Sequence, residues 1–228
     1  MLAEADADEI VCAGAPAEKW KANAEPERDW ENLSRLISAL DRSRATRCVL
    51  VSTVDVFADS RGVDESTPAD DGQEQAYGRN RAKLEQFVAK RFDEALIVRL
   101  PGMFGPGLKK NLLFDLIHQP HERFANSAST FQFYDVRELW GHILLAQDAG
   151  LGVVHLATEP VSAAEVARES FGVEYVENER NEAHYDLRTR HADVLAGRDG
   201  AYLRTRGEIV AAIRSWAADE LAEAGPRS

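Results

Sequence analysis

The sequence has few cysteines and no long apolar run. Its only cysteines, Cys12 and Cys48, lie within apolar stretches of the 228-residue chain, which predicts reduced thiols that act as small core residues of a cytoplasmic protein. No Cys/His cluster has metal-ligand spacing, so we expect no metal site. No apolar run approaches the ~20 residues that span a bilayer, and the acidic first residues do not resemble a secretory signal. No membrane partner is expected.

Positive charge is also scarce. The chain has 27 Lys and Arg against 39 Asp and Glu, a net charge of -12. Nucleic acids are bound through clustered Lys and Arg, so a nucleic-acid partner is not expected. Hydrophobic residues make up 44% and charged residues 29%, as in soluble globular proteins. The length allows one medium domain, or a domain with a small lobe.

Apolar runs and helical patterns alternate along most of the chain. We expect strands at 9–15, 47–57, 94–102, 129–136 and 152–158, and helices at 25–44, 77–91, 111–118, 137–149, 162–172 and 207–225. Strands that are apolar on both faces and alternate with helices predict an α/β fold with a parallel sheet and flanking helices. The pattern weakens after residue 172, which predicts a small C-terminal lobe.

Ligands bind at the carboxyl ends of parallel strands, and one such end carries the polar residues Thr53 and Asp55. Tyr77 and Arg81 begin the next helix and, four residues apart, share one face. Lys83 would lie roughly 240° around the helix from Tyr77. A phenol, with an ordinary pKa near ~10, needs a nearby cation to exchange protons at neutral pH. The alternative is a solvated helix face, with Thr53 as a strand-end hydroxyl and Asp55 as a cap or ion-pair partner.

Three segments in this order, "VLVSTVDVF", "AYGRNRAKLE" and "VRLPGMFGPG", resemble the extended short-chain dehydrogenase/reductases. That group includes the NAD-dependent epimerases and dehydratases that act on sugar nucleotides. "VCAGAP", "FQFYDVRELW" and "VVHLATEPVSAAEVA" agree with the resemblance. It implies a partial Rossmann-like sheet over residues 1–158, with 107–133 on the substrate side, and a substrate lobe over 159–228.

The resemblance also implies roles for individual residues. Thr53 would hydrogen-bond the reacting oxygen, Tyr77 would be the catalytic acid–base, and Arg81 would stand where the family has a lysine that binds nicotinamide ribose. The implied cofactor is NAD or NADP, and the implied partner is a small molecule, possibly a nucleotide sugar. The other implied contacts are Ala13, Gly14 and Pro101 with the cofactor, and Asp55, Lys109, Lys110 and Asn111 with the substrate.

Three departures from the family pattern matter. Arg81 keeps the charge of a lysine but changes its shape and reach. Val54 and Asp55 stand where the family's dehydratases have two acids. The Gly-rich turn that holds the pyrophosphate is absent, and the strand at 9–15 resembles the family's fourth. That strand is therefore expected at a sheet edge, in a truncated chain or beside a second subunit such as another copy.

Two functions follow as hypotheses. The first is an NAD(P)-dependent epimerase, dehydratase or reductase that transfers a hydride to or from a sugar-nucleotide-type substrate, although dinucleotide binding by this chain alone is in question. The second is a catalytically silent binding or scaffold protein of the same fold. Dinucleotide binding distinguishes them.

Overall fold

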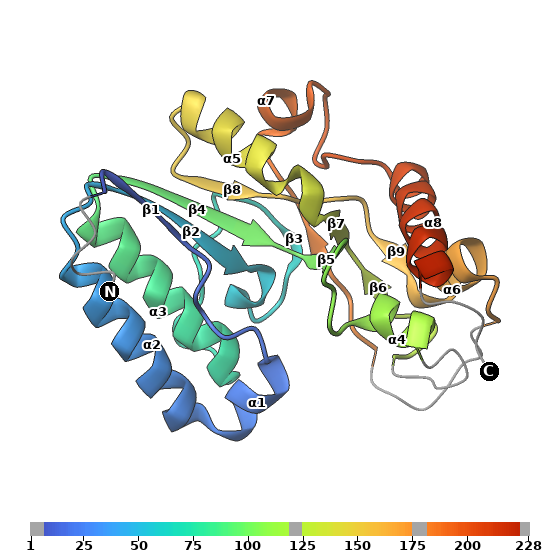
Figure 1. Ribbon diagram of the computed structural model, residues 1–228, viewed down its shortest axis with the longest axis horizontal. Helices are drawn as coiled ribbons and strands as arrows, with labels where there is room; N and C mark the ends of the chain where they lie inside the picture. Colours follow the sequence, from blue (N-terminus) through green and yellow to red (C-terminus); the bar gives the residue numbers. More distant parts are fainter. Residues whose placement is uncertain (1–6, 119–124, 175–181, 224–228) are drawn as a thin grey trace. The chain divides into compact units, whose positions relative to one another are not determined.

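The computed structural model describes residues 7–118, 125–174 and 182–223 (Figure 1). Its contacts divide the chain into two compact units. The first unit comprises Met1–Ser60, Glu65–Leu100 and Ile143–His155, and the second comprises Arg61–Asp64, Pro101–His142 and Leu156–Ser228. Residues 101–142 therefore group with the C-terminal residues, whereas the sequence assigned only 107–133 to the substrate side.

The first unit is built on a four-stranded parallel sheet in the order β1-β2-β4-β8. The strands are β1 (Glu9–Cys12), β2 (Arg47–Thr53), β4 (Glu94–Leu100) and β8 (Val153–His155). This architecture confirms the predicted α/β class. Among the described residues, β1 pairs only with β2 and lies at the edge of the sheet, as expected.

Two long helices, α2 (Pro26–Asp41) and α3 (Ala76–Arg91), lie side by side along the sheet (Figure 1). The short helix α1 (Lys19–Ala24) contacts both of them. Pro26 begins α2, where its fixed φ suits the first helical turn. The apolar faces of the helices and sheet form one core, which contains Cys12, Leu33, Leu40, Cys48, Leu50, Leu84 and Val88.

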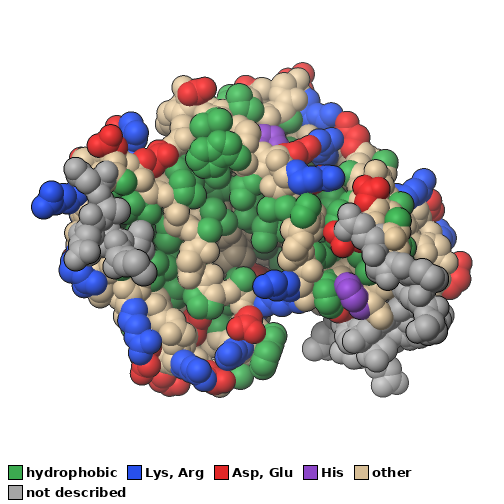
Figure 2. Space-filling view, viewed as in Figure 1, with side chains coloured by type: hydrophobic (Ala, Val, Ile, Leu, Met, Phe, Trp, Pro, Cys, Tyr) green, Lys and Arg blue, Asp and Glu red, His purple; other side chains and the backbone are tan. Residues whose placement is uncertain are grey.

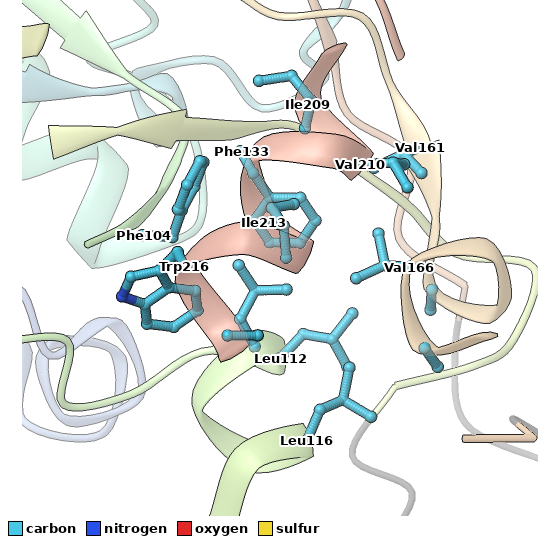
Figure 3. Close-up of a cluster of buried hydrophobic side chains, with 14 of the residues drawn as sticks. Phe104, Leu112, Leu116, Phe133, Val161, Val166, Ile209, Val210, Ile213 and Trp216 are labelled. Atoms are coloured by element: carbon cyan, nitrogen blue, oxygen red, sulfur yellow. The ribbon is translucent and has the colours of Figure 1, made fainter. Parts of the chain in front are cut away.

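The second unit holds short strands and helices around its own core (Figure 3). Its strand pairs are β3 (Arg61–Val63) with β10 (Asp186–Leu187), β5 (Gly102–Phe104) with β7 (Phe133–Asp135), and β6 (Thr130–Phe131) with β9 (Val161–Ser162). Its helices are α4 (Leu112–His118), α6 (Ala163–Phe171), α7 (Ala192–Ala196) and α8 (Arg206–Glu223), and α5 (Leu139–Asp148) runs from this unit into the first. Trp216 of α8 is buried in this core beside Phe104.

Local signals explain where several elements end. Ser162 caps α6 by accepting a hydrogen bond from Glu165 N, and Gly172 ends it in the left-handed region at φ 65°. The helix thus lies within the range expected at 162–172. The strand expected at 47–57 ends instead at Thr53, because its side chain caps a 3-10 turn, η2 (Val54–Val56). A second 3-10 turn, η3 (Val136–Glu138), precedes α5.

The surface carries both charge signs, and the core holds both cysteines. On the face that Figure 2 draws, acidic and basic side chains are interspersed. Both cysteines are buried free thiols, and burial raises the pKa of Cys48 to about 12. Within the described ranges, no helix is long and apolar enough to cross a membrane, and no group of three His, Cys, Asp or Glu side chains is placed to hold a metal.

Candidate active site

The residues predicted for the first unit's site gather at the carboxyl edge of its sheet. Ala13 and Gly14 follow β1 and are exposed, and Thr53 is the last residue of the neighbouring strand β2. Because the two strands are parallel, their carboxyl ends lie at the same edge.

The turn after β2 is organised by Thr53 and Asp55. Thr53 Oγ1 accepts a hydrogen bond from Asp55 N at 3.2 Å and lies 3.5 Å from Asp55 Oδ2. The other carboxylate oxygen of Asp55 is 2.7 Å from Lys19 Nζ of α1. The expected ion-pair role of Asp55 is therefore present, and it brings a cation that sequence reasoning missed.

Tyr77 is fixed at the start of α3 by contacts from two directions. Its backbone N donates to Asn23 Oδ1 of α1 at 2.9 Å. The next residue, Gly78, lies so close to the turn after β2 that a Cβ there would be 1.9 Å from Asp55 O and 2.6 Å from Gln73 Nε2. Only glycine allows this approach. Tyr77 is 7% exposed.

Arg81 lies beside Tyr77, as the four-residue spacing predicted. Its guanidinium carbon is 4.0 Å from the centroid of the Tyr77 ring. Nη1 donates to Asp29 Oδ2 of α2 at 2.5 Å and to Tyr77 O at 3.3 Å, and Nη2 donates to Pro16 O. The Arg81 and Asp29 side chains are 3% and 4% exposed. The guanidinium is therefore held in a buried ion pair, and Asn80 Nδ2 also donates to the Asp29 carboxylate at 2.8 Å.

Lys83 does not substitute for Arg81. Its Nζ lies 5.3 Å from the centroid of the Trp30 ring on α2. A cation over an aromatic face gains a modest electrostatic stabilisation. The helical rotation that separates Lys83 from Tyr77 accounts for this placement.

Burial is the largest influence on the Tyr77 phenol and raises its pKa above the ordinary value of 10.0. The Arg81 charge lowers that pKa, the Asp55 carboxylate raises it, and the Thr53 hydrogen bond and the Lys19 charge lower it. Arg81 thus acts in the predicted direction, but burial outweighs it. In this state the phenol is protonated at neutral pH, so it is ready to donate a proton.

A second buried ion pair fastens α3 to the sheet. Glu85 of α3 accepts from Arg99 Nη2 of β4 at 2.7 Å and from Ser52 Oγ of β2 at 2.5 Å. Arg99 Nη1 lies 3.1 Å from His155 Nε2 of β8. His155 is fully buried. These contacts connect three strands to the helix that carries Tyr77.

The remaining predicted residues lie in the second unit. Pro101 is buried, whereas Lys109 and Lys110 are exposed. The Asn111 side chain donates to Met103 O at 2.7 Å and accepts from the backbone N of Leu113 and Phe114 at 3.0 and 3.1 Å. Asn111 therefore caps α4.

Sequence reasoning missed four residues that shape this site: Lys19, Asn23, Asp29 and Gly78. Lys19 and Asn23 lie on α1, a six-residue helix that no long apolar period announces. Asp29 lies among several acids of α2 and meets Arg81 from 52 positions away. A signal was available only for Gly78, because glycine destabilises a helix and its presence there calls for a packing reason.

Comparison with known proteins shows which family the sequence of this chain matches. A family model described as "NAD dependent epimerase/dehydratase family" matches residues 1–162. No curated protein sequence matched the chain.

Solved structures share its fold at low identity. UDP-glucose 4-epimerase from Bifidobacterium longum, in complex with NAD+ and UDP, has a TM-score of 0.72 at 16% identity, with 96% of this chain and 76% of that chain covered. RMD from Pseudomonas aeruginosa, complexed with NADPH, has a TM-score of 0.73 at 14% identity, with 95% of this chain and 81% of that chain covered. DesIV, a dTDP-glucose 4,6-dehydratase from Streptomyces venezuelae with NAD and TYD bound, has a TM-score of 0.72 at 17% identity, with 96% of this chain and 76% of that chain covered.

Proposed function

We propose that this chain, which belongs to the NAD-dependent epimerase/dehydratase family, is an NAD(P)-dependent epimerase, dehydratase or reductase that acts on a sugar-nucleotide-type substrate. The structures of the relatives named above hold NAD+ with UDP, NADPH, and NAD with TYD, respectively. Family membership and these relatives support the reaction class.

One local observation carries the proposal. The Thr53 hydroxyl, the Tyr77 phenol and the Arg81 guanidinium come from two separate elements and meet at the carboxyl edge of the parallel sheet. Such an edge is where α/β enzymes of this architecture bind ligands. A solvated helix face would not bury an aromatic ring under a paired guanidinium.

The proposed chemistry of these residues is proton transfer at one substrate oxygen. The Thr53 hydroxyl would hydrogen-bond that oxygen, and the Tyr77 phenol would donate a proton to it or accept one from it. Asp55 is proposed to contact the sugar. A bound nicotinamide would supply the hydride acceptor or donor.

One atom of Arg81 favours a nicotinamide ribose beside Tyr77. Its Nε is buried and has no hydrogen-bond partner within the described structure. An unpaired buried N–H costs about 1–3 kcal/mol, and a ribose hydroxyl would pair with it if the Arg81 side chain, which is 3% exposed, opened towards the ligand. Ala13 and Gly14, exposed at the end of β1, are proposed to lie against the cofactor backbone, and Pro101 near the nicotinamide amide. Lys109, Lys110 and Asn111 are proposed to lie on the substrate side.

A second candidate function rests on the same arginine. The Arg81 guanidinium is held by Asp29 and by the Pro16 carbonyl oxygen, so little of it is available to a ligand. A catalytically silent binding or scaffold protein of this fold would tolerate such an arrangement.

Titration with NADH and NADPH, followed by nicotinamide fluorescence, separates the two candidates. The enzyme proposal predicts saturable binding that Gly14→Glu weakens at least tenfold, because a carboxylate at that position would repel the cofactor phosphates. Ser38→Glu adds the same charge at an exposed position of α2 and should leave the affinity unchanged. Absence of saturable binding to the unmodified chain would favour the silent candidate.

A further inference from the structure

The charge and the proton of Arg81 are less available to Tyr77 than those of a lysine at this position would be. Its charge is balanced by the buried Asp29 carboxylate 2.5 Å away, so the pair is neutral as a whole. A guanidinium also keeps its proton at any pH at which the protein is folded. Arg81 can therefore hold the Tyr77 ring, but it cannot pass a proton onward, and its field at the phenol is partly cancelled.

Lys19 is a second cation near the same site, and its side chain is partly exposed to solvent. Lys19 of α1 pairs with Asp55 at 2.7 Å, and Asp55 in turn contacts the Thr53 hydroxyl. The Lys19 and Asp55 side chains are 38% and 19% exposed, in contrast to the buried Arg81–Asp29 pair. These groups form a polar series that leads from the half-buried Thr53 hydroxyl to solvent.

We propose that Lys19 supplies a positive charge to the Tyr77 site in addition to that of Arg81, and that it is a positioning residue for proton transfer at Tyr77, acting through Asp55. Lys19 holds the Asp55 carboxylate at the Thr53 side of the site and offsets its negative charge. The charged groups that act on Tyr77 are then Lys19 from α1, Asp55 from the turn after β2, and Arg81 from α3 with its partner Asp29 from α2. The catalytic role of Lys19 rests on the proposed function of Tyr77. The effect of Lys19 on the pKa of Tyr77 is measurable without turnover.

These charges determine whether a substitution at Lys19 raises or lowers the pKa of Tyr77. The Lys19 ammonium favours the phenolate, and the Asp55 carboxylate disfavours it, so both change the pKa of Tyr77 in known directions. Lys19→Gln removes the favourable charge and the ammonium that offsets the Asp55 carboxylate, which raises that pKa. Lys19→Arg keeps the charge and should leave the pKa close to that of the parent chain. In the double variant Lys19→Gln/Asp55→Asn both charges are gone, and the rise should largely disappear.

The test is a titration of position 77 in the full chain. A fluorinated tyrosine placed there has a more acidic phenol, so its titration falls where the protein stays folded, and ¹⁹F NMR follows it. Lys19→Gln should raise the measured pKa by roughly half a unit or more in low salt, and by less in high salt because the pair is partly exposed. Lys21→Gln is the matched control on α1, since Lys21 pairs with the exposed Glu18 at 3.8 Å.

An unchanged pKa in Lys19→Gln, or an equal rise in Lys21→Gln, would overturn the inference. Because the measurement needs neither cofactor nor substrate, a chain that binds no dinucleotide still tests it. Failure of the proposed function and failure of this inference are thus separate results.

Discussion

At the scale of single residues, the approach of α3 to the turn after β2 depends on the absent side chain of Gly78. A Cβ at this position would lie 1.9 Å from Asp55 O, so Gly78→Ala must push the helix and the turn apart. Alanine gains roughly 1 kcal/mol over glycine in a helix interior, but overpacking of this kind costs more. We expect Gly78→Ala to lower the free energy of unfolding by about 1–3 kcal/mol in urea denaturation.

Gly141 provides the matched control. It also lies within a helix, α5, and a Cβ there would meet no atom within 4 Å. Gly141→Ala should therefore raise the free energy of unfolding by up to about 1 kcal/mol. If the two variants had the same stability, the close approach at Gly78 would be refuted.

The sequence predicted part of the site for physical reasons. The four-residue spacing places Arg81 over Tyr77 because the helix repeats every 3.6 residues, and Thr53 ends a strand that the apolar pattern identified. Neither Asp29 nor Lys19 could be predicted, since each meets its partner through tertiary packing over 52 and 36 positions. The raised pKa of Tyr77 was missed for the same reason, because burial is not visible in a local pattern.

At the scale of elements, the buried pair of Asp29 and Arg81 fastens α2 to α3. Removing one partner leaves a buried charge without compensation, which typically costs about 3–5 kcal/mol. We expect Asp29→Ala to lose stability of that order in urea unfolding. Asp41→Ala, which removes an exposed partner of Arg91 at 3.4 Å on the same pair of helices, should lose less than about 1 kcal/mol.

A double replacement separates charge burial from packing. In Asp29→Leu/Arg81→Met both charges are gone, and apolar side chains of similar size often restore the stability of such a site. Recovery of most of the lost stability would show that the cost came from the unpaired guanidinium. A double variant as unstable as Asp29→Ala would contradict this explanation.

Elements with a long apolar period were predicted well, and short ones were not. The structure contains α2 at Pro26–Asp41 and α3 at Ala76–Arg91, close to the expected ranges. The helices α1 and α7 have six and five residues, too few for a helical period to be recognised. The strand expected at 129–136 is divided into β6, which pairs with β9, and β7, which pairs with β5. Tertiary contacts decide which strands pair, so a local sequence pattern does not reveal these partners.

At the scale of the whole molecule, the chain divides into a sheet unit and a second unit with its own core. The Tyr77 site, with Lys19, Asp29, Thr53 and Arg81, lies entirely within the sheet unit. The chain covers 76–81% of the three solved relatives named above. Ala13 and Gly14, which are proposed to contact the cofactor, follow the edge strand β1 of the sheet unit. Cofactor binding by the chain as given is therefore the property on which the choice between enzyme and silent protein depends.

The most direct test of the account is the turnover of Tyr77→Phe, measured as kcat with NAD or NADPH and with UDP-glucose or dTDP-glucose as substrate. Loss of the phenol proton should lower kcat by about 10²–10⁴, while the affinity for the dinucleotide stays within twofold. Tyr185→Phe, which keeps the ring that stacks on Phe131 in the second unit, should retain the parent rate. Turnover by Tyr77→Phe at the parent rate, or none by the parent chain itself, would contradict the claim that Tyr77 is the acid–base of an enzyme.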